Sequence, residues 1–169
     1  MPLRKNVRLV DTGRRASADA VRAAAVTLLS RRDFAVRELH EKLAARGFAA
    51  DTVTAVLTEL ARERLLDDER YAHNYVSFHA RRRQGPVRIA ADLRRHGLAG
   101  ELIEAALASG PDWHELARNA RIARFGPKPP GSWAEKARQA RFLQYRGFSS
   151  DHIRAATGAD PDTGSPDLG

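Results

Sequence analysis

Arginine is the residue type whose number and spacing in this sequence could support chemistry. The fifteen residues from 81 to 95 contain six arginines, namely Arg81, Arg82, Arg83, Arg88, Arg94 and Arg95. A guanidinium group presents its N–H donors in a planar fork, so it binds phosphate or carboxylate groups through paired hydrogen bonds. Because few acidic residues lie nearby, we interpret this group as contacting nucleic acid or an acidic protein partner. The alternative is a solvated helix end whose cations offset the helix dipole.

A second group of cations lies later in the sequence. It consists of Lys136, Arg138, Arg141 and Arg146, with Arg118, Arg121 and Arg124 in the segment before them. Arg121 and Arg124 are three residues apart, as are Arg138 and Arg141, so each pair shares a face of a helix. We predict that this group also contacts DNA or a filament. Ion pairing at the surface is a stronger alternative here than in the first group, since Asp112, Glu115 and Glu135 are close in sequence.

The other reactive residue types show no pattern typical of an active site or a metal site. The sequence has no cysteine, which excludes disulfides, thiolate metal sites and cysteine nucleophiles. Its six histidines lack metal-ligand spacing, and the adjacent acids at 67–69 fit the start of a helix better than an ion cage. Residues 126–132 lack the ending of a phosphate loop and contain three prolines, so we interpret them as a stiff linker. We therefore expect no enzymatic activity, no cofactor and no metal.

Aromatic residues near the first arginine group could stack on nucleic-acid bases. The candidates are Tyr71, Tyr75 and Phe78. Tyr75 lies in an apolar stripe of helical spacing, so packing in the core is the favoured interpretation for it.

Composition and charge indicate a helical protein with a polyanionic partner. The chain has 169 residues, of which 43% are hydrophobic, and a formal net charge of +8. A basic surface attracts polyanions, and nucleic acid is the commonest of these for a cytosolic protein. The longest apolar run, Ala23–Leu29, is far shorter than the roughly 20 residues that a membrane-spanning helix needs. We expect a cytoplasmic protein that does not bind membranes.

The clearest pattern in the sequence is a repeat of fifty residues. It aligns the glycines Gly47, Gly97 and Gly147, the leucines Leu43, Leu93 and Leu143, and the apolar residues Val53, Ile103 and Ile153. A glycine that follows a helix can adopt positive φ without a steric penalty, so each glycine is expected to end a helix. Self-similarity at a fixed period is typical of a repeat architecture.

We therefore predict an all-α fold of three tandem three-helix repeats that form an elongated, curved, right-handed-helical array. The predicted divisions are a basic N-terminal arm (1–16), repeat 1 (17–66), repeat 2 (67–109), repeat 3 (111–157) and a disordered tail (158–169). Such an array would offer a long face to an extended partner.

Three segments, in order, resemble the RecX family. The strongest match runs from Leu65-Leu66-Asp67-Asp68-Glu69-Arg70-Tyr71-Ala72 to Gly85-Pro86-Val87-Arg88 and on to Arg95-His96-Gly97. Upstream, Ser30-Arg31-Arg32-Asp33 and Arg46-Gly47-Phe48 are similar to the first part of the family pattern. Downstream, Lys136–Phe148 is similar to its third part. The resemblance covers about residues 22–157.

The resemblance implies a bacterial cytoplasmic regulator that binds the RecA filament on single-stranded DNA and reduces its ATP hydrolysis, strand exchange and coprotease activity. We expect a monomer, with weak binding to double-stranded DNA left open. An autonomous helical DNA-binding protein, architectural or transcriptional, is the alternative. The candidate filament- and DNA-binding residues are Arg31, Arg32, Arg81, Arg82, Arg83, Arg88, Arg94, Arg95, Lys136, Arg138, Arg141 and Arg146.

One departure from the family pattern concerns the start of a helix. Many relatives have Ser or Thr where Ala35 stands, three residues before Glu38, and that residue would cap the helix. Alanine cannot accept the capping hydrogen bond, which is worth about 1 kcal/mol. We expect Asp33 or water to take its place.

Overall fold

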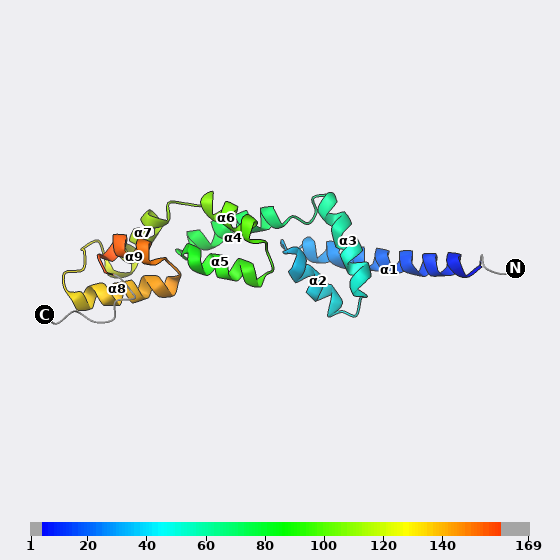
Figure 1. The fold of residues 1–169 in the computed structure, drawn as a ribbon, viewed down its shortest axis with the longest axis horizontal. Coiled ribbons are helices and arrows are strands. Elements are labelled where there is room, and N and C mark those ends of the chain that lie inside the picture. The colour runs from blue at the N-terminus through cyan, green and yellow to red at the C-terminus, as the bar shows by residue number, and fades with distance from the viewer. Residues whose placement is uncertain (1–4, 160–169) are drawn as a thin grey trace. The chain divides into compact units, whose positions relative to one another are not determined.

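The computed structural model describes residues 5–159, with side chains from residue 17 onward. Over this range the chain forms nine α-helices and no strand, which confirms the predicted all-α class (Figure 1). The helices are α1 (Lys5–Leu29), α2 (Val36–Ala44), α3 (Ala50–Arg62), α4 (Asp68–Arg81), α5 (Pro86–Arg95), α6 (Gly100–Ala108), α7 (Trp113–Phe125), α8 (Trp133–Arg146) and α9 (Ser150–Thr157).

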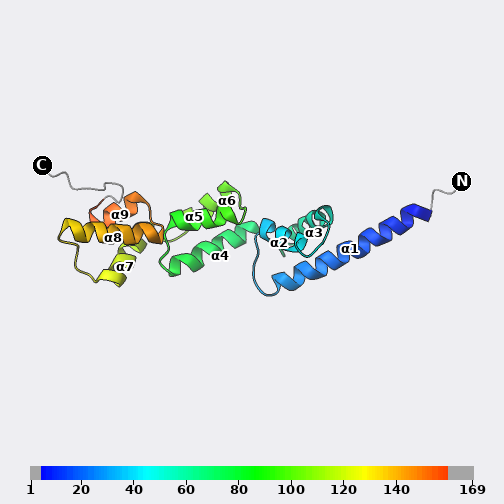
Figure 2. The same ribbon diagram turned by 90° about the horizontal axis from the view of Figure 1, so that it is seen from below.

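The chain divides into two compact units. The first extends to Tyr71 and also includes His96–Leu98, whereas the second contains Ala72–Arg95 and the chain from Ala99 onward. The boundary therefore falls inside α4, whose first turn belongs to the first unit. Figure 2 shows α2 and α3 beside α1 in the first unit, and α7, α8 and α9 together in the second. The elongated, curved shape of the array stays a prediction.

The fifty-residue repeat coincides with the buried positions of the fold. The three aligned leucines are fully buried, and the aligned Val53, Ile103 and Ile153 are at most 1% exposed. The three aligned glycines all have positive φ, of 91°, 84° and 92°. These positions confirm the prediction of three helical repeats, because the same side chains fill the core and the same residue type ends the middle helix in each.

The first repeat has an extensive apolar core. Val21, Ala25 and Leu28 of α1 pack with residues of α2 and α3 and of the two adjoining loops, which are Phe34, Leu39, Leu43, Val53, Val56, Leu57, Leu60 and Leu66. The third repeat has a smaller core, rich in alanine, made of Ala117, Ala120, Ala140, Leu143, Phe148 and Ile153. Small side chains allow the backbones of α7, α8 and α9 to approach closely.

The two predicted end segments fall partly within the described residues. Residues 5–16, predicted as part of a basic arm, are helical and continuous with the rest of α1. The predicted tail begins at Gly158, and its residues 160–169 lie outside the described part, as do residues 1–4. The boundaries assigned to the arm, repeats and tail stay predictions.

Two helix starts in the third repeat are capped by local side chains. Ser132 accepts a hydrogen bond from the backbone N–H of Glu135, and the Glu135 carboxylate accepts one from the backbone N–H of Ser132, which confirms the predicted capping box. The carboxylate of Asp112 accepts from the backbone N–H groups of His114 and Glu115 at the start of α7. Backbone hydrogen bonds lower the pKa of both carboxyls, from Glu115 and His114 for Asp112 and from Gly131 and Ser132 for Glu135.

The start of α2 is capped from outside its own helix, because the Val36 N–H has Asp68 as its acceptor rather than the expected Asp33 or water. An oxygen of Asp68 lies 2.8 Å from the backbone nitrogen of Val36 and accepts its hydrogen bond. Burial raises the pKa of the Asp68 carboxyl, and the hydrogen bond from Val36 acts in the opposite direction. Asp33 instead accepts a hydrogen bond from Arg70.

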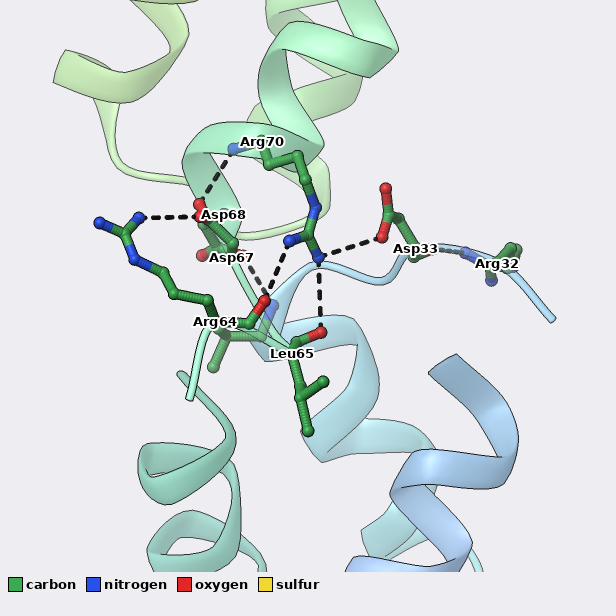
Figure 3. A network of polar contacts seen from close by, with 8 residues as sticks. Arg32, Asp33, Arg64, Leu65, Asp67, Asp68 and Arg70 are labelled. Carbon is green, nitrogen blue, oxygen red and sulfur yellow. Dashed lines mark hydrogen bonds and ion pairs between the residues drawn. The ribbon is translucent and has the colours of Figure 1, made fainter. Parts of the chain in front are cut away.

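Arg70 ties the end of α3 to the start of α4 (Figure 3). Its guanidinium donates to the carbonyls of Arg64 and Leu65, at 3.0 and 3.4 Å, and to Asp33 at 3.3 Å. Its backbone N–H donates to Asp67, which caps α4 as predicted and also pairs with Arg64. The carbonyls after α3, which have no helical partner, are thus satisfied by a side chain of the next repeat.

Candidate nucleic-acid interface

The three consecutive arginines of the first group lie at the C-terminal end of α4 and are exposed. Nε of Arg81 donates to the carbonyl of Ser77, 3.3 Å away. The Arg82 guanidinium lies 4.6 Å from the centroid of the Phe78 ring, a cation–π contact on the surface. Arg83 has a φ of 57°, which turns the chain away from the helix axis after α4.

Arg146, at the end of α8, contacts the same end of α4. Its Nε donates to the carbonyl of Arg83 at 3.2 Å, and its Nη2 donates to the carbonyl of Arg82. Helix C-terminal carbonyls carry partial negative charge and lack helical partners, so a guanidinium is a favourable donor to them. Two cations that are 63 residues apart in sequence are therefore neighbours in space.

The backbone reinforces this contact. The N–H of Gly85 donates to the carbonyl of Arg146 at 2.8 Å, and the N–H of Val87 donates to that of Gly147 at 3.0 Å. A Cβ on Gly85 would lie 2.2 Å from the Gly147 oxygen, and a Cβ on Gly147 would lie 2.2 Å from the Arg88 Cβ. The two segments approach this closely because both positions are glycine.

An open hollow of about 200 Å³ lies where α4, α7 and α8 meet. Its lining consists of Arg82, Arg83, Ala120, Ala123, Arg124, Phe142 and Arg146. Four of these seven residues are arginines and none is acidic. Because like charges that converge without counter-charges focus a positive potential, the hollow favours an anion.

A second hollow, of about 500 Å³, adjoins the first and shares Arg124 and Phe142 with it. Its other lining residues are Phe125 and Arg138. The guanidinium groups of Arg124 and Arg138 lie 5.7 and 5.4 Å from the centroid of the Phe125 ring. The rings of Phe125 and Phe142 meet edge to face with centroids 5.3 Å apart. We call the two hollows together the arginine surface, made of Arg82, Arg83, Arg124, Arg138, Arg146, Phe125 and Phe142.

The remaining candidates of the second unit do not line either hollow. On α5, Arg95 forms an ion pair with Asp92, Arg94 is exposed, and Arg88 packs on Gly147 with its guanidinium 6.0 Å from the Tyr145 ring. On α8, Arg141 is exposed and Lys136 is half-buried. The arginine surface thus unites part of the first cation group with part of the second.

Arg121 is not part of this surface, and its inclusion in the second cation group is wrong. It is 4% exposed, and its guanidinium donates to the carbonyl of Lys128 at 3.1 Å. It also lies 3.5 Å from the carbonyls of Gly126 and Pro127. Arg121 therefore holds the 126–132 linker on α7, while Arg124, one turn later, is exposed.

Arg31 and Arg32 belong to the first unit. Arg31 is exposed, whereas Arg32 pairs with Glu38 at 2.5 Å and lies 3.6 Å from the centroid of the Phe34 ring. The hydrogen bond that Arg32 donates to Glu38 raises the pKa of Arg32 above its already high value. Its guanidinium already has an acidic partner, so contact with a phosphate would compete with an existing ion pair.

The aromatic residues of the arginine surface differ from those that the sequence singled out. Tyr71 is buried and contacts His96, and the half-buried ring of Tyr75 lies 4.0 Å from the ring of His79, centroid to centroid, so neither is an open stacking platform. Phe78 is 47% exposed beside Arg82. Sequence reasoning missed Phe125 and Phe142; the available indication was that each directly follows an arginine, Arg124 and Arg141.

Two further searches concern the described residues only. No group of three or more His, Cys, Asp or Glu side chains is arranged there to hold a metal ion. None of the described helices combines the length and the apolar character that crossing a membrane requires.

Comparison with known proteins gives a consistent result over most of the chain. Family profiles described as the first, second and third three-helix domains of RecX match residues 22–60, 67–107 and 112–157. The "Regulatory protein RecX" of Halorhodospira halophila is 47% identical over 145 residues, which are 85% of this chain and 90% of that protein. The protein of the same name from Ectopseudomonas mendocina is 41% identical over 143 residues, covering 83% and 95%.

Solved structures agree in fold. The crystal structure of RecX from Lactobacillus salivarius matches with a TM-score of 0.74 at 22% identity, over 83% of this chain and 94% of that one. A second structure, described as regulatory protein RecX, matches with a TM-score of 0.77 at 21% identity, over 92% and 78%. At these identities the likeness concerns the fold alone.

Proposed function

The chain belongs to the RecX family of regulatory proteins, and on that premise we propose that it binds the RecA filament on single-stranded DNA and restrains it. The proposed effects are reduced RecA ATP hydrolysis, strand exchange and coprotease activity, in recombination and DNA repair. The protein acts by occupying the filament and catalyses no reaction of its own.

The observation that carries the proposal is the arginine surface. Five arginines from α4, α7 and α8 line two adjoining hollows, and no acidic side chain lines either of them. A polyanion gains binding free energy from each guanidinium it contacts, because condensed counterions are released from its phosphates. A protein filament on DNA presents both phosphates and acidic side chains. The cations of α5 offer further hydrogen-bond donors to those acidic side chains.

Binding across a filament accounts for the regulatory effect. A ligand that binds the assembled filament at several points makes changes in that filament energetically costly, since all of its contacts must be released together. Protomer exchange and the conformational cycle that accompanies ATP hydrolysis both require such changes. The expected result is slower turnover at amounts of this protein well below those of RecA.

The test is RecA ATP hydrolysis on single-stranded DNA with the full chain added at low stoichiometry. We expect the rate to fall, and filaments observed by electron microscopy to stop growing. An unchanged rate and filament length would remove the proposal. If the protein instead bound duplex DNA tightly by itself, with a steep salt dependence and no effect on RecA, the alternative of an autonomous DNA-binding protein would hold.

A further inference from the structure

We propose that the two hollows of the arginine surface form one site for a single unstacked nucleotide of a DNA strand. The phosphate lies in the smaller hollow and the base lies against Phe125 and Phe142 in the larger one. This inference rests on the proposed function, because it names the part of the filament that the surface would bind.

The smaller hollow has the composition of a phosphate site. Arg82 and Arg83 come from the end of α4, Arg124 from α7 and Arg146 from α8, so positive charge reaches the hollow from three directions. The carbonyls of Arg82 and Arg83 fix the Arg146 guanidinium and use two of its five N–H donors, which leaves donors for a phosphate. A volume of about 200 Å³ is several times the share of one water, about 30 Å³, so it admits a hydrated phosphate.

The larger hollow has the composition of a base site. Phe125 and Phe142 are both partly exposed, and their edge-to-face contact holds the two rings at a fixed mutual angle. The guanidinium groups of Arg124 and Arg138 lie over the Phe125 ring, so they add planar cationic surfaces next to the two aromatic rings. Nucleic-acid bases stack on such aromatic and guanidinium planes whatever their identity, since every base has a π face.

The two hollows are close enough together for the phosphate and the base of one nucleotide. Arg124 and Phe142 line both of them, so the two hollows are adjacent and a single extended ligand can contact both. In a duplex each base is stacked and paired, so its π face is unavailable to the protein. The site therefore favours single-stranded over double-stranded DNA and is indifferent to sequence.

The experiment measures binding of the full chain to three labelled ligands of equal length by fluorescence anisotropy. They are a thymidine oligonucleotide, an oligomer of abasic deoxyribose phosphates, and a duplex. We expect the wild-type protein to bind the thymidine oligonucleotide about tenfold more tightly than the abasic oligomer, which is the size of one stacking contact. Equal affinity for these two ligands would overturn the base site.

Two variants separate the two ends of the site. Phe125→Leu keeps an apolar side chain at the end of α7 and should remove about tenfold of affinity for the thymidine oligonucleotide, with no change for the abasic oligomer. Arg124→Gln should weaken both, and should reduce the slope of log affinity against log salt by about 0.7. A loss from Phe125→Leu that is the same on both ligands would contradict the assignment.

Matched controls lie on α8. Tyr145 is an aromatic residue that is 77% exposed beside an arginine but lines neither hollow, so Tyr145→Leu should leave both affinities unchanged. Arg141→Gln removes an exposed arginine that lines neither hollow, and should weaken binding less than Arg124→Gln. Losses from these controls as large as those from Phe125→Leu and Arg124→Gln would overturn the site.

Two further measurements distinguish this site from other outcomes. Thymidine monophosphate should compete only weakly, and competition equal to that of the oligonucleotide would point to a free nucleotide as the ligand and overturn the strand assignment. RecA ATP hydrolysis is measured in parallel with the same proteins. If the wild-type protein slows RecA ATP hydrolysis but binds the thymidine and abasic oligomers equally well, the nucleotide site is wrong and the proposed function still holds.

Discussion

The carboxylate of Asp68 and the backbone N–H of Val36 form a hydrogen bond of 2.8 Å between residues 32 positions apart in sequence. Val36 is the first residue of α2, where N–H groups have no acceptor within the helix. Ala35, at the position that a serine or threonine would use for capping, makes no side-chain hydrogen bond. The start of α2 is therefore capped by the first residue of α4.

Removal of this cap should destabilise the protein. Asp68→Ala is expected to lower the free energy of unfolding by about 1–2 kcal/mol, since the Val36 N–H loses its acceptor. Asp68→Asn keeps an acceptor oxygen and should recover most of that loss. Urea denaturation measures both. Glu69→Ala, at the exposed next position, is the control and should change little; equal losses at 68 and 69 would contradict the capping role.

Gly147 and Gly47 form a matched pair for measuring the close contact between α5 and the turn after α8. Both have positive φ, of 92° and 91°, so alanine at either position costs about 1–2 kcal/mol of backbone strain. A Cβ at Gly47 meets nothing within 4 Å, whereas one at Gly147 would overlap Arg88. Thermal unfolding should show Gly147→Ala less stable than Gly47→Ala by about a further 1–3 kcal/mol. Equal losses would mean that the segments can move apart freely.

Arg121 should be essential to the stability of the third repeat, because its buried guanidinium holds the 126–132 linker. Arg121→Met removes the donor to the Lys128 carbonyl, so we expect a loss of about 2 kcal/mol or more in the free energy of unfolding. Arg121→Lys should not restore stability, because a single ammonium cannot reach several carbonyls at once. The comparison is Arg124→Met, an exposed position one turn away, which urea denaturation should find close to wild type.

The stability of the third repeat should fall in mild acid because of His152. Burial lowers the pKa of this imidazole below its ordinary value of 6.5, and nearby His114 lowers it further. When the pH falls through 6.5, the unfolded chain therefore takes up a proton that the folded protein resists, and unfolding is favoured. Melting temperatures between about pH 7.5 and pH 5.5 should fall more steeply for wild type than for His152→Gln. Parallel curves would show that His152 is not responsible.

Charge reversal at the end of α4 should weaken filament binding without unfolding the protein. Arg82 and Arg83 line the smaller hollow, whereas Arg81 does not, so Arg82→Glu with Arg83→Glu should weaken binding almost as much as reversal of all three. The carbonyls that accept hydrogen bonds from Arg146 belong to the backbone and remain in both variants. Circular dichroism checks the fold, and co-sedimentation with RecA on DNA measures binding. Unchanged co-sedimentation of the folded variants would remove Arg82 and Arg83 from the interface.

The fold was largely predictable because the three repeats can be aligned with one another within the single sequence. The aligned glycines must end helices, and the aligned leucines must be buried, whatever the rest of the chain does. Conversely, the cap on α2 could not be predicted from local sequence. It depends on how closely the start of α4 approaches α2, which is a tertiary contact between Asp68 and Val36.

The candidate site was predictable only in part. Periodicity places residues on a face of one helix, but Arg146 joins Arg82 and Arg83 through backbone carbonyls, which sequence patterns do not show. Spacing also suggested the same environment for Arg121 and Arg124, since they are three residues apart. A side chain at the edge of a buried face can point inward when backbone carbonyls there accept its hydrogen bonds. The 126–132 linker supplies such carbonyls for Arg121.

The contacts of Arg70 set where the chain can be cut. During synthesis α1, α2 and α3 leave the ribosome before Arg70 does, so for that interval the carbonyls of Arg64 and Leu65 lack the donor that they have in the finished protein. A fragment that stops after α3 would lack the Arg70 donor to these carbonyls permanently. A fragment that continues through Tyr71 would keep the Arg70 contacts, but it would lack His96–Leu98, which also belong to the first unit.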